Sequence, residues 1–534
     1  MKMKKQILFV LLIGAVSQLS AQVQLLKVYE NKYSAPIGTY QGIQFREGGF
    51  SGLCLIPGTD GKEFYTLSDR GVNIDAKNAS CTPTYDKIYS FPNYAPKIHR
   101  VKLNGDSVQI LKSFNIKRPN GTNASGIINP TGFGSTSTEK AWSNIPTNCA
   151  DPSTVEVAKD VWGIDCEGIA IGKNNDFWVC EEGGPTVWNI GADGKVIKRY
   201  SPYANQIGAE PQDVAIDTVF KYRKNNRGFE GVAITPSGKV YAIIQSAMLN
   251  PNKTDGELSN VHRILEIDPV SGMTKMYAYL NPGINGTSPN KISAKDWKIG
   301  DLTAVNDTVF LVIEQGVGGT NVQRNIYQIS IKGATPISST LYGGKTVEQL
   351  KDAAGLAANS IVPVSKKLFV DLKASGWPDV LEKAEGLAIV NDSTIAVSND
   401  NDFGQWSATE NGIATVNNIS SYIYTFGLKG SNKIMNYVAQ SNVVNIPTLI
   451  ENEDVSINND LFEVYPNPVK DVLVIRMKEK ENASVELVDL GGRIIKKLQF
   501  NNEILLNMND MAKGVYVLKV DTGDQFKAVK IIKE

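Results

Sequence analysis

Apolar and polar residues alternate along most of this chain, in short runs that end at turn-forming residues. In DCEGIAIGKNNDFWVCEEGG, residues 165–184, an acid and a glycine precede one apolar run, polar residues follow, and a second apolar run ends at two glutamates. Strand-forming residues on both sides of a polar turn predict a β-hairpin. Carboxylates are therefore expected at the open end of this hairpin.

The same pattern recurs along the chain. GFEGVAITPSGKVYAIIQSA and AEGLAIVNDSTIAVSNDNDFG repeat the acid, the glycine and both apolar arms. Two weaker copies, GFSGLCLIPGTDGKEFYTLSDRG and IGDLTAVNDTVFLVIEQGVG, carry Ser51 and Gly300 where the others carry the acid. Repetition of one supersecondary unit is typical of repeat architectures. These copies begin at Gly228, Ala384, Gly49 and Ile299.

A second hairpin follows several of the leading hairpins, as in TVWNIGADGKVIKRYS and HRILEIDPVSGMTKMYAYL. Four strands in about 40 residues, repeated, predict the blades of a β-propeller, an all-β fold without long exposed sheet edges. We expect six blades, with five or seven as alternatives. QLLKVYENKY, residues 24–33, is a candidate for the strand that closes the last blade.

Long insertions interrupt the repeats at residues 117–160, 202–227, 282–298 and 341–383. Each precedes a leading hairpin. The link into the first strand of a four-stranded blade lies at the same end as the link between its second and third strands, so all four insertions are expected at one mouth of the propeller. Apolar spacing within residues 210–224 and 346–355 predicts helices.

The N-terminus has the features of a secretory signal peptide: Lys2, Lys4 and Lys5, then ILFVLLIGAV, then small residues up to Ala21. No other segment approaches the roughly 20 apolar residues that a membrane span needs. Beyond residue 430 the chain becomes rich in asparagine, and alternating strands resume near its end. We expect a signal peptide at 1–21, the propeller at 22–430, a polar linker at 431–461 and a small β-sandwich at 462–534.

Composition narrows the classes of partner. The chain has 55 basic and 55 acidic residues, so no overall charge draws it to nucleic acid or to an anionic membrane. Its five cysteines are too few for a disulfide framework in a chain of 534 residues, although export permits disulfides. We expect one or two structural disulfides or inert thiols, with the pairing open.

The carboxylates of the repeats are the main candidate for chemistry. Because the first strand of each blade is innermost, Glu167, Glu230 and Glu385 are expected to meet around the central axis. Clustered carboxylates repel one another and are costly to bury unless a cation or a proton compensates. Oxygen ligands favour Ca²⁺, with Mg²⁺ second. Further acids stand at the ends of second strands, at the same mouth: Asp69, Glu181, Glu182, Glu314, Asp400 and Asp402.

We predict a metal held by Glu167, Glu230, Glu385, Glu314 and Asp400. The first three are also candidate catalytic bases, and Asp69, Glu181 and Glu182 are candidate substrate-binding groups. Arg70, which follows Asp69, has a planar guanidinium suited to phosphate or carboxylate, and is both a catalytic and a substrate-binding candidate. The alternatives are that each acid accepts hydrogen bonds from the backbone of the next blade, and that Arg70 forms a salt bridge within its own blade.

Other catalytic sets have little support. The two histidines, His99 and His262, lie on expected third strands away from the axis, which favours structural roles. The chain has no GxSxG motif, Walker A loop or GxGxxG turn after a strand. A Ser-His-Asp hydrolase and a nucleotide cofactor are therefore disfavoured.

Residues 42–429 resemble the phytase-like family, also described as having esterase-like activity of phytase. The resemblance rests on GGFSGLCLIPGTDGKEFYTLSDRG, DCEGIAIGKNNDFWVCEEGG, RGFEGVAITPSGKVYAIIQS and AEGLAIVNDSTIAVSNDND, and on their order along the chain. It implies an exported hydrolase of phosphate or carboxylic esters. It brings no established catalytic residues.

The tail resembles the type A sorting domain of the type IX secretion system, through VYPNPVKDVLVI at Val464, LVDLGGRIIKK at Leu487 and AKGVYVLKV at Ala512. The resemblance implies passage through the periplasm and the outer membrane, with the secretion machinery as a partner. The mature protein is then expected to be secreted or held at the cell surface.

We therefore predict an exported propeller hydrolase that acts on phosphate or carboxylic esters at a metal in its acidic mouth. Two alternatives remain. One is a non-catalytic propeller that binds a surface glycan or peptide and exposes Trp142, Trp297 and Trp406 at the mouth. The other is a calcium-dependent propeller of the lactonase type.

Overall fold

The structure is a computed structural model, and the chain divides into two compact units, residues 1–447 and 448–534. The expected signal peptide, residues 1–21, and Trp406 lie outside the described residues. None of the helices described is long and apolar enough to cross a membrane. The described residues are 22–79, 81, 86–133, 139–206, 209–405, 410–439, 457–458, 461–479, 482–489, 493–523 and 526–533.

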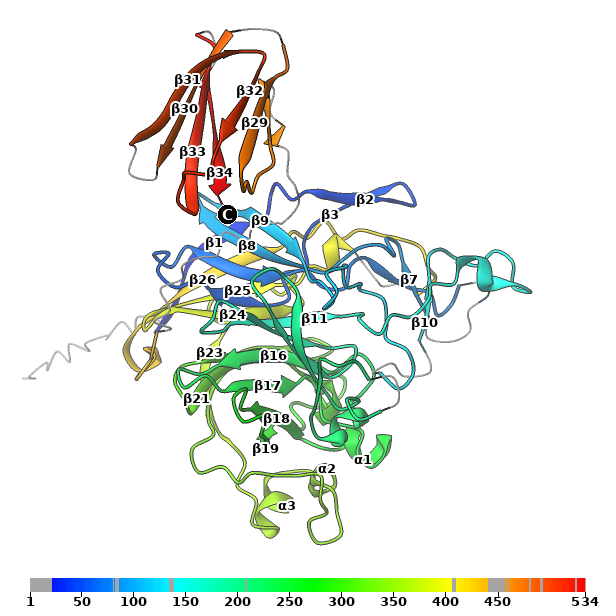
Figure 1. Cartoon of the computed structure of the whole chain (residues 1–534). Helices are drawn as coiled ribbons and strands as arrows, with labels where there is room; N and C mark the ends of the chain where they lie inside the picture. The colour runs from blue at the N-terminus through cyan, green and yellow to red at the C-terminus, as the bar shows by residue number, and fades with distance from the viewer. Residues whose placement is uncertain are drawn as a thin grey trace, which may run out of the picture. The chain divides into compact units, whose positions relative to one another are not determined.

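The first unit contains five four-stranded antiparallel blades; the strands follow sequence order in four of them, and the fifth takes its outer strand from the start of the chain (Figure 1). In Figure 1 the strands of blade 3, β16 to β19, lie side by side in green. The blades are β4 (Leu53–Leu55), β5 (Glu63–Leu67), β8 (Lys97–Asn104) and β9 (Ser107–Asn115); β11 (Cys166–Ile171), β12 (Phe177–Glu181), β13 (Thr186–Ile190) and β14 (Val196–Ser201); β16 (Phe229–Ile234), β17 (Val240–Ile244), β18 (Val261–Ile267) and β19 (Thr274–Leu280); β20 (Trp297–Ala304), β21 (Val309–Gly318), β22 (Asn321–Ser330) and β23 (Ser365–Asp371); and β24 (Ala384–Asn391), β25 (Thr394–Asn399), β26 (Tyr422–Leu428) and β1 (Val23–Glu30).

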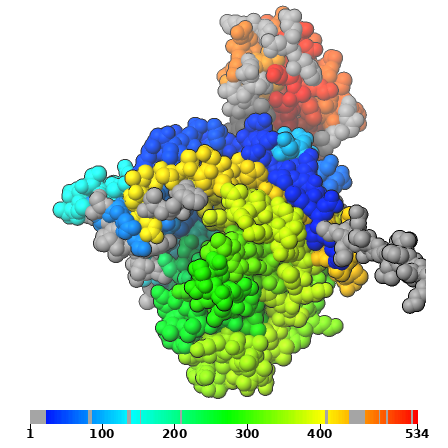
Figure 2. Space-filling view, turned by 180° about the vertical axis from the view of Figure 1, so that it is seen from behind, coloured from blue at the N-terminus to red at the C-terminus, as the bar shows by residue number. Residues whose placement is uncertain are grey.

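The N-terminal strand closes the ring. β1 pairs antiparallel with β26, so the last blade takes its outer strand from the start of the chain, as expected. Figure 2 shows the blue N-terminal strand beside the yellow segment near residue 420. The inner strands contact one another in the order β4, β11, β16, β20, β24 and back to β4. The β-propeller is thus confirmed with five blades rather than six, because the ring closes with no diverged sixth copy.

Crowding at the axis explains the glycine that follows each acid. A Cβ atom at Gly231 would lie 2.3 Å from the backbone nitrogen of Leu302 in the next blade, and one at Gly168 would lie 2.8 Å from that of Val232. A β-bulge at the same place shifts the register between Cys166 and Gly168 of β11, and the other acidic strands share it. The acid-glycine pair is therefore the local signature of inner strands packed backbone against backbone.

Most insertions lie where the sequence predicts. The described residues of 116–165, 202–228 and 281–296 link the fourth strand of one blade to the first strand of the next, at the end where the inner strands begin. The described residues of 68–96 and 400–421 link second strands to third strands at the same end. The helix expected at 210–224 is instead a short strand and a 3₁₀ turn, which is capped at its start by Asp217, whose side chain accepts a hydrogen bond from the N–H of Val219. The elements outside the blades are β2 (Pro36–Tyr40), β3 (Ile43–Arg46), β6 (Asn73–Asp75), β7 (Asp86–Tyr89), β10 (Lys140–Trp142), β15 (Asp213–Ala215), α1 (Lys253–Glu257), α2 (Val347–Leu350), α3 (Ala353–Ala358), and the 3₁₀ turns η1 (Pro152–Val155), η2 (Thr218–Tyr222), η3 (Ala294–Asp296), η4 (Asp402–Gly404) and η5 (Gly430–Asn432).

The insertion expected at 341–383 is different. It contains β23, the fourth strand of its blade, so the irregular part links the third strand to the fourth at the opposite end of the propeller. It follows the outer edge of blade 3, where Ile337 bridges to Met276 of β19. Helices α2 and α3 confirm the predicted helical character, split in two, and Glu348 of α2 forms a buried ion pair with Arg263 at 2.7 Å.

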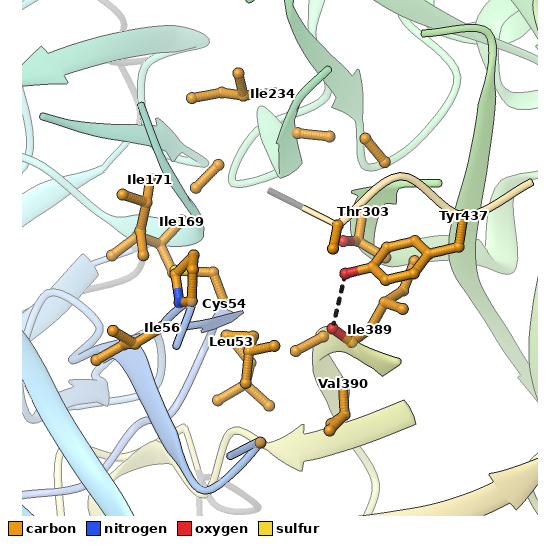
Figure 3. Close-up of a pocket in the computed structure, with 18 of the residues that line it drawn as sticks. Leu53, Cys54, Ile56, Ile169, Ile171, Ile234, Thr303, Ile389, Val390 and Tyr437 are labelled. Atoms are coloured by element: carbon orange, nitrogen blue, oxygen red, sulfur yellow. Dashed lines mark hydrogen bonds between the residues drawn. The ribbon is translucent and has the colours of Figure 1, made fainter. Parts of the chain in front are cut away.

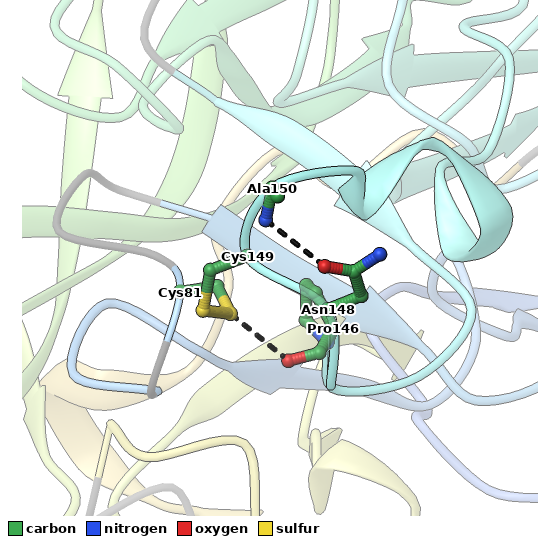
Figure 4. The surroundings of a disulfide bond; sticks show 5 residues. All are labelled: Cys81, Pro146, Asn148, Cys149 and Ala150. Carbon is green, nitrogen blue, oxygen red and sulfur yellow. Dashed lines mark hydrogen bonds between the residues drawn. A yellow bond between two sulfur atoms is a disulfide. The ribbon is translucent and has the colours of Figure 1, made fainter.

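A disulfide ties the insertions of blade 1 and blade 2 together. Cys81 and Cys149 are bonded, and Cys81 Sγ lies 3.2 Å from the carbonyl oxygen of Pro146 (Figure 4). The other cysteines are free thiols: Cys54 is partly buried, and Cys166 and Cys180 are buried. The expectation of a structural disulfide with inert thiols is met.

Loss of this disulfide is expected to destabilise the protein. The bond closes a loop of 68 residues, for which the chain-entropy model gives about 4 kcal/mol. The double variant Cys81→Ser/Cys149→Ser should therefore unfold at a lower urea concentration, and a reducing agent should shift the wild type to the same midpoint. Equal midpoints in oxidising and reducing buffer would contradict a stabilising role.

The second unit is a sandwich of two four-stranded sheets. Alternate residues of the facing strands are buried, among them Leu473, Ile475, Val485 and Leu518. This pattern confirms the predicted β-sandwich. One sheet holds β27 (Ile457–Asn458), β28 (Phe462–Tyr465), β29 (Val472–Met477) and β32 (Glu503–Asn507), and the other holds β31 (Ile494–Asn501), β30 (Asn482–Asp489), β33 (Gly514–Asp521) and β34 (Phe526–Lys533).

Residues 431–439, expected to begin a polar linker, pack against the propeller. Ile434 is buried and its N–H donates to the Asp392 carbonyl, and the N–H of Val438 donates to the carbonyl of Val305. The apolar residues within this asparagine-rich stretch therefore extend the propeller unit beyond residue 430.

Candidate functional site

Three glutamates meet on the axis of the propeller, as the repeats predict. Glu167, Glu230 and Glu385 come from blades 2, 3 and 5, and one carboxylate oxygen of each lies within 4.8 Å of the others. All three side chains are buried, with Glu230 only 1% exposed. The β-bulge at each acid turns these side chains toward the common centre instead of into the sheet. We call these residues the glutamate triad.

The triad has carboxylate oxygens without hydrogen bonds. Among the described residues, Glu230 Oε2 and Glu385 Oε2 are buried and form no hydrogen bond, and the side-chain oxygen of Gln245 also forms none. Lys383 Nζ lies 4.0 Å from Glu385 Oε2. Native proteins rarely leave buried polar atoms unsatisfied, so each such atom needs an explanation. A bound cation would provide one, because it would accept these lone pairs.

The alternative role, in which an acid accepts hydrogen bonds from the backbone of the next blade, applies to an acid outside the triad. Asp301 occupies the glycine position of blade 4, and its carboxylate accepts hydrogen bonds from the N–H groups of Leu302 at 2.7 Å and Leu387 at 2.6 Å. Leu387 belongs to blade 5, so Asp301 ties two blades together. The triad lacks such contacts, and its carboxylates therefore differ from a structural blade motif.

Burial and mutual repulsion raise the pKa of every triad member. For Glu167 and Glu230, burial is the main cause and the neighbouring glutamates add to it, so their pKa values lie well above the ordinary range. Burial raises the pKa of Glu385 to about 8, even though Lys383 opposes the shift. Near neutral pH the triad therefore holds protons unless a cation replaces them.

A lysine occupies the neighbouring acidic cluster. Oxygens of Asp69, Asp400 and Asp402 also converge within 4.8 Å, but Lys383 Nζ lies 2.6 Å from Asp400 Oδ2 and 2.8 Å from Asp402 Oδ1. Burial disfavours a charged Lys383, yet Asp400 and Asp402 outweigh it and raise its pKa well above the usual value. An ammonium group thus supplies the positive charge that these acids need, and Asp400, predicted as a metal ligand, is bound to Lys383.

Arg70 is not free to bind a substrate. Its guanidinium is 5% exposed and forms ion pairs with Asp165 at 3.3 Å and Glu139 at 3.5 Å. It also donates to the hydroxyl of Tyr89 and to Asn73. Asp165 belongs to blade 2 and Glu139 to the insertion before it, so Arg70 joins blades rather than pairing within its own. Its predicted roles in phosphate binding and catalysis are not supported by this placement.

The acids at the ends of second strands divide into two groups. Glu181 and Glu314 stand opposite Cys166 and Ile299, one residue before the acid position of the partner strand. Glu181 accepts hydrogen bonds from the N–H of Gly184, and Glu314 pairs with Lys366 and with Tyr279 at 2.6 Å. Glu314 therefore lies outside the acidic clusters and is not placed as a metal ligand.

Glu182 and Asp400 come one residue later and face the mouth, because successive side chains of a strand point to opposite sides. Glu182 accepts hydrogen bonds from Asn226 at 2.7 Å and from Gln245 at 2.8 Å. Burial raises the pKa of Glu182 to about 7, and the charge of Asp165 adds to the shift. Asp69 likewise has a raised pKa, from burial and from Asp165.

Two cations at the mouth, Arg227 and Lys298, escaped the sequence analysis, as did Lys383. A simple signal could have found two of them: Lys298 and Lys383 stand two residues before the acid position, as Asp165 does in blade 2. Both lysines interact electrostatically with Glu385, so they lie near the triad.

The remaining candidates have structural surroundings. His99 and His262 are fully buried, and hydrogen bonds engage Nδ1 of His99 with Ser113 and Nε2 of His262 with Asn281. Burial lowers the pKa of His99 to about 4 and that of His262 to about 3. Both are therefore neutral at physiological pH, in agreement with the predicted structural roles.

Cavities lie at both ends of the axis. One of about 270 Å³ adjoins the acidic mouth and is lined by Lys383, Asp400 and Asp402. Another, of about 230 Å³, lies at the opposite end among the turns of the inner hairpins, with Leu53, Ile169 and Ile389 around it (Figure 3). The second is lined largely by aliphatic residues, and the first is lined by Lys383 and its acids and by none of the triad glutamates.

The closed ring of blades and the buried glutamates on its axis define a β-propeller protein with an acidic central site. Residues 46–403 match the family described as Phytase-like, esterase-like activity of phytase. The chain belongs to this family. Residues 463–534 match the secretion system C-terminal sorting domain, so the protein is exported through the type IX secretion system to the cell surface or beyond.

Individual relatives are distant. An "uncharacterized secreted protein" of Arthroderma benhamiae is 30% identical over 138 residues, covering 22% of this chain and about a quarter (26%) of the relative. The aldose sugar dehydrogenase of Streptomyces coelicolor is 11% identical with a TM-score of 0.28, over 76% of this chain and 98% of its own. The gluconolactonase XC5397 of Xanthomonas campestris is 9% identical with a TM-score of 0.27, over the same shares of 76% and 98%.

Proposed function

We propose that this protein is an exported, calcium-dependent ester hydrolase whose metal is held by Glu167, Glu230 and Glu385. The observation that carries the proposal is the convergence of three buried carboxylates in which one oxygen of Glu230 and one of Glu385 form no hydrogen bond. Hard carboxylate ligands suit Ca²⁺, and Mg²⁺ less well, because Mg²⁺ demands stricter octahedral geometry and retains its waters. Membership of a family described by esterase-like activity of phytase supports hydrolysis as the reaction.

The bound ion would polarise the ester oxygen and lower the pKa of a water molecule. In the reaction, the water oxygen bonds to the phosphorus or carbonyl carbon, the bond to the alcohol oxygen breaks, and the alcohol leaves with the proton. The residues around the triad would hold the other carboxylates in fixed positions. Lys383 pairs with Asp400 and Asp402 beside the site, and Arg70 pairs with Asp165. This network keeps the mouth rigid and leaves the triad as the open acidic group.

A paired assay tests the proposal. Protein treated with EDTA is expected to lose hydrolysis of p-nitrophenyl phosphate or p-nitrophenyl acetate, and Ca²⁺ is expected to restore it. A lactone substrate in the same assay separates a lactonase-type propeller from a phosphatase or carboxylesterase. Activity that is indifferent to EDTA would exclude the metal mechanism, and calcium binding without turnover of any ester would favour a binding propeller. Against a binding propeller, Trp142 and Trp297 are buried and not exposed at the mouth.

Metal-free protein is expected to lose stability as the pH rises from about 5 to about 8. The folded-state pKa is raised to about 7 for Glu182 and to about 8 for Glu181 and Glu385, whereas an unfolded glutamate has a pKa of about 4.3. The folded state therefore holds more protons in this window, and its stability falls as they leave. Urea midpoints measured in EDTA at several pH values check this, and Ca²⁺ should reduce the loss because it binds only the folded triad. A midpoint in EDTA that rises with pH would contradict it.

A further inference from the structure

Two cations beside the triad keep unused hydrogen-bond donors. Within the described part of the chain, Lys298 forms no hydrogen bond and no ion pair, although it is partly buried. Arg227 makes one side-chain hydrogen bond, from Nη1 to Ser246 Oγ at 3.3 Å. A guanidinium has five N–H donors, so the others remain open among the described residues. Some buried cations of the propeller are paired, for example Arg263 with Glu348 at 2.7 Å.

The placement of these cations is unfavourable without a ligand. Lys298 is the second residue of the inner strand of blade 4 and stands two residues before Gly300, the position that holds the acid in blades 2, 3 and 5. Burial lowers the pKa of Lys298, and the positive charges of Arg227 and Lys383 lower it further, whereas Glu385 and Glu182 oppose the shift. Like charges thus gather at one side of the mouth, and Glu182 and Glu385 offset them without forming an ion pair with Lys298 or Arg227 among the described residues; an anion bound there would lower the remaining repulsion.

We propose that Arg227 and Lys298 form the anion-binding half of the central site and make it selective for phosphomonoesters over neutral carboxylic esters; this rests on the proposed hydrolase function. The carboxylate oxygens of Glu230 and Glu385 that form no hydrogen bond suit a cation, and the open donors of Arg227 and Lys298 suit an anion. A phosphomonoester dianion next to a metal meets both needs, since its oxygens can accept from a guanidinium and an ammonium at once. A neutral ester leaves the donors unmatched.

The specificity is tested with Lys298→Met and Arg227→Met in the calcium-loaded protein. Each variant is expected to raise KM for p-nitrophenyl phosphate about tenfold or more, because charge-assisted hydrogen bonds to the substrate are lost, and to leave KM for p-nitrophenyl acetate unchanged. Lys298→Arg is expected to recover most of the loss. Lys295→Met is the matched control, because Lys295 is exposed in the same segment and pairs with Glu257 at 3.7 Å. Equal changes for both esters would overturn the proposal.

A binding measurement separates failure of this inference from failure of the hydrolase function. Inorganic phosphate is expected to raise the melting temperature of the calcium-loaded wild type and of Lys295→Met, and not that of Lys298→Met. That result supports the anion site even if no ester is turned over. Absence of phosphate stabilisation in the wild type, or its persistence in both Lys298→Met and Arg227→Met, would overturn the anion site. Melting curves without phosphate report whether each variant is folded.

Discussion

Glu230→Gln is expected to lower calcium-dependent ester hydrolysis by about a hundredfold or more, since a metal ion supplies several kcal/mol to such reactions and each 1.4 kcal/mol is a factor of ten. Glu230 contributes one of the two unpartnered carboxylate oxygens, and an amide cannot replace its negative charge. Stabilisation of the protein by Ca²⁺ should be lost in parallel. Calcium titration by calorimetry and ester assays check both effects.

The stability of metal-free Glu230→Gln separates a metal site from a structural contact. Removal of one charge from the triad relieves repulsion, so the urea midpoint of the variant in EDTA at pH 8 is expected to exceed that of the wild type. If Glu230 instead tied blades together, the variant would be less stable with and without Ca²⁺. Glu156→Gln is a suitable control because Glu156 is exposed.

Gly231→Ala is expected to destabilise the propeller by about 3 kcal/mol or more, because overpacking against backbone is poorly relieved. The new Cβ atom would lie 2.3 Å from the backbone nitrogen of Leu302, and the two inner strands would have to separate. Denaturant unfolding and the yield of folded protein measure the effect.

Gly427→Ala is the matched control. The three atoms nearest to a Cβ atom at Gly427 all belong to the side chain of Leu26, the first at 3.0 Å, and Leu26 is largely exposed and can rotate away. This variant is expected to fold with near wild-type stability. If both variants unfold at the same denaturant concentration, close packing of the inner strands is not what requires glycine.

Repetition made the architecture predictable. Each leading hairpin carries its own turn residues, its own alternation and the acid-glycine pair, so the inner strand of every blade is visible in isolation. The expected sixth blade shows the limit of this approach: ring closure depends on how five inner strands pack together, and no single repeat encodes it. The fourth strand β23 was missed for a related reason, because edge strands carry a weak pattern of burial.

The ion-pair partners of the charged side chains at the site were less predictable than the positions of those side chains. The sequence places Arg70 and Glu314 at the mouth end of their strands, and both are there, but Arg70 is engaged by Asp165 and Glu139, and Glu314 by Lys366. These partners are distant in sequence or belong to neighbouring blades. Neighbouring residues of a strand point to opposite sides, so a shift of one residue turns a side chain from the mouth toward the space between blades. This difference separates Glu314 from the triad.

The sequence by itself determined the repeated blades, the exported character of the chain, the sorting domain and the meeting of Glu167, Glu230 and Glu385, because all of these follow from local pattern and from the symmetry of a propeller. Only the tertiary structure decided which charges are satisfied. It pairs Lys383 with Asp400, assigns Asp301 to the backbone of the next blade, and leaves oxygens of the triad open. Electrostatic partnership depends on distances of a few ångströms between blades, and no pattern within one repeat specifies those distances.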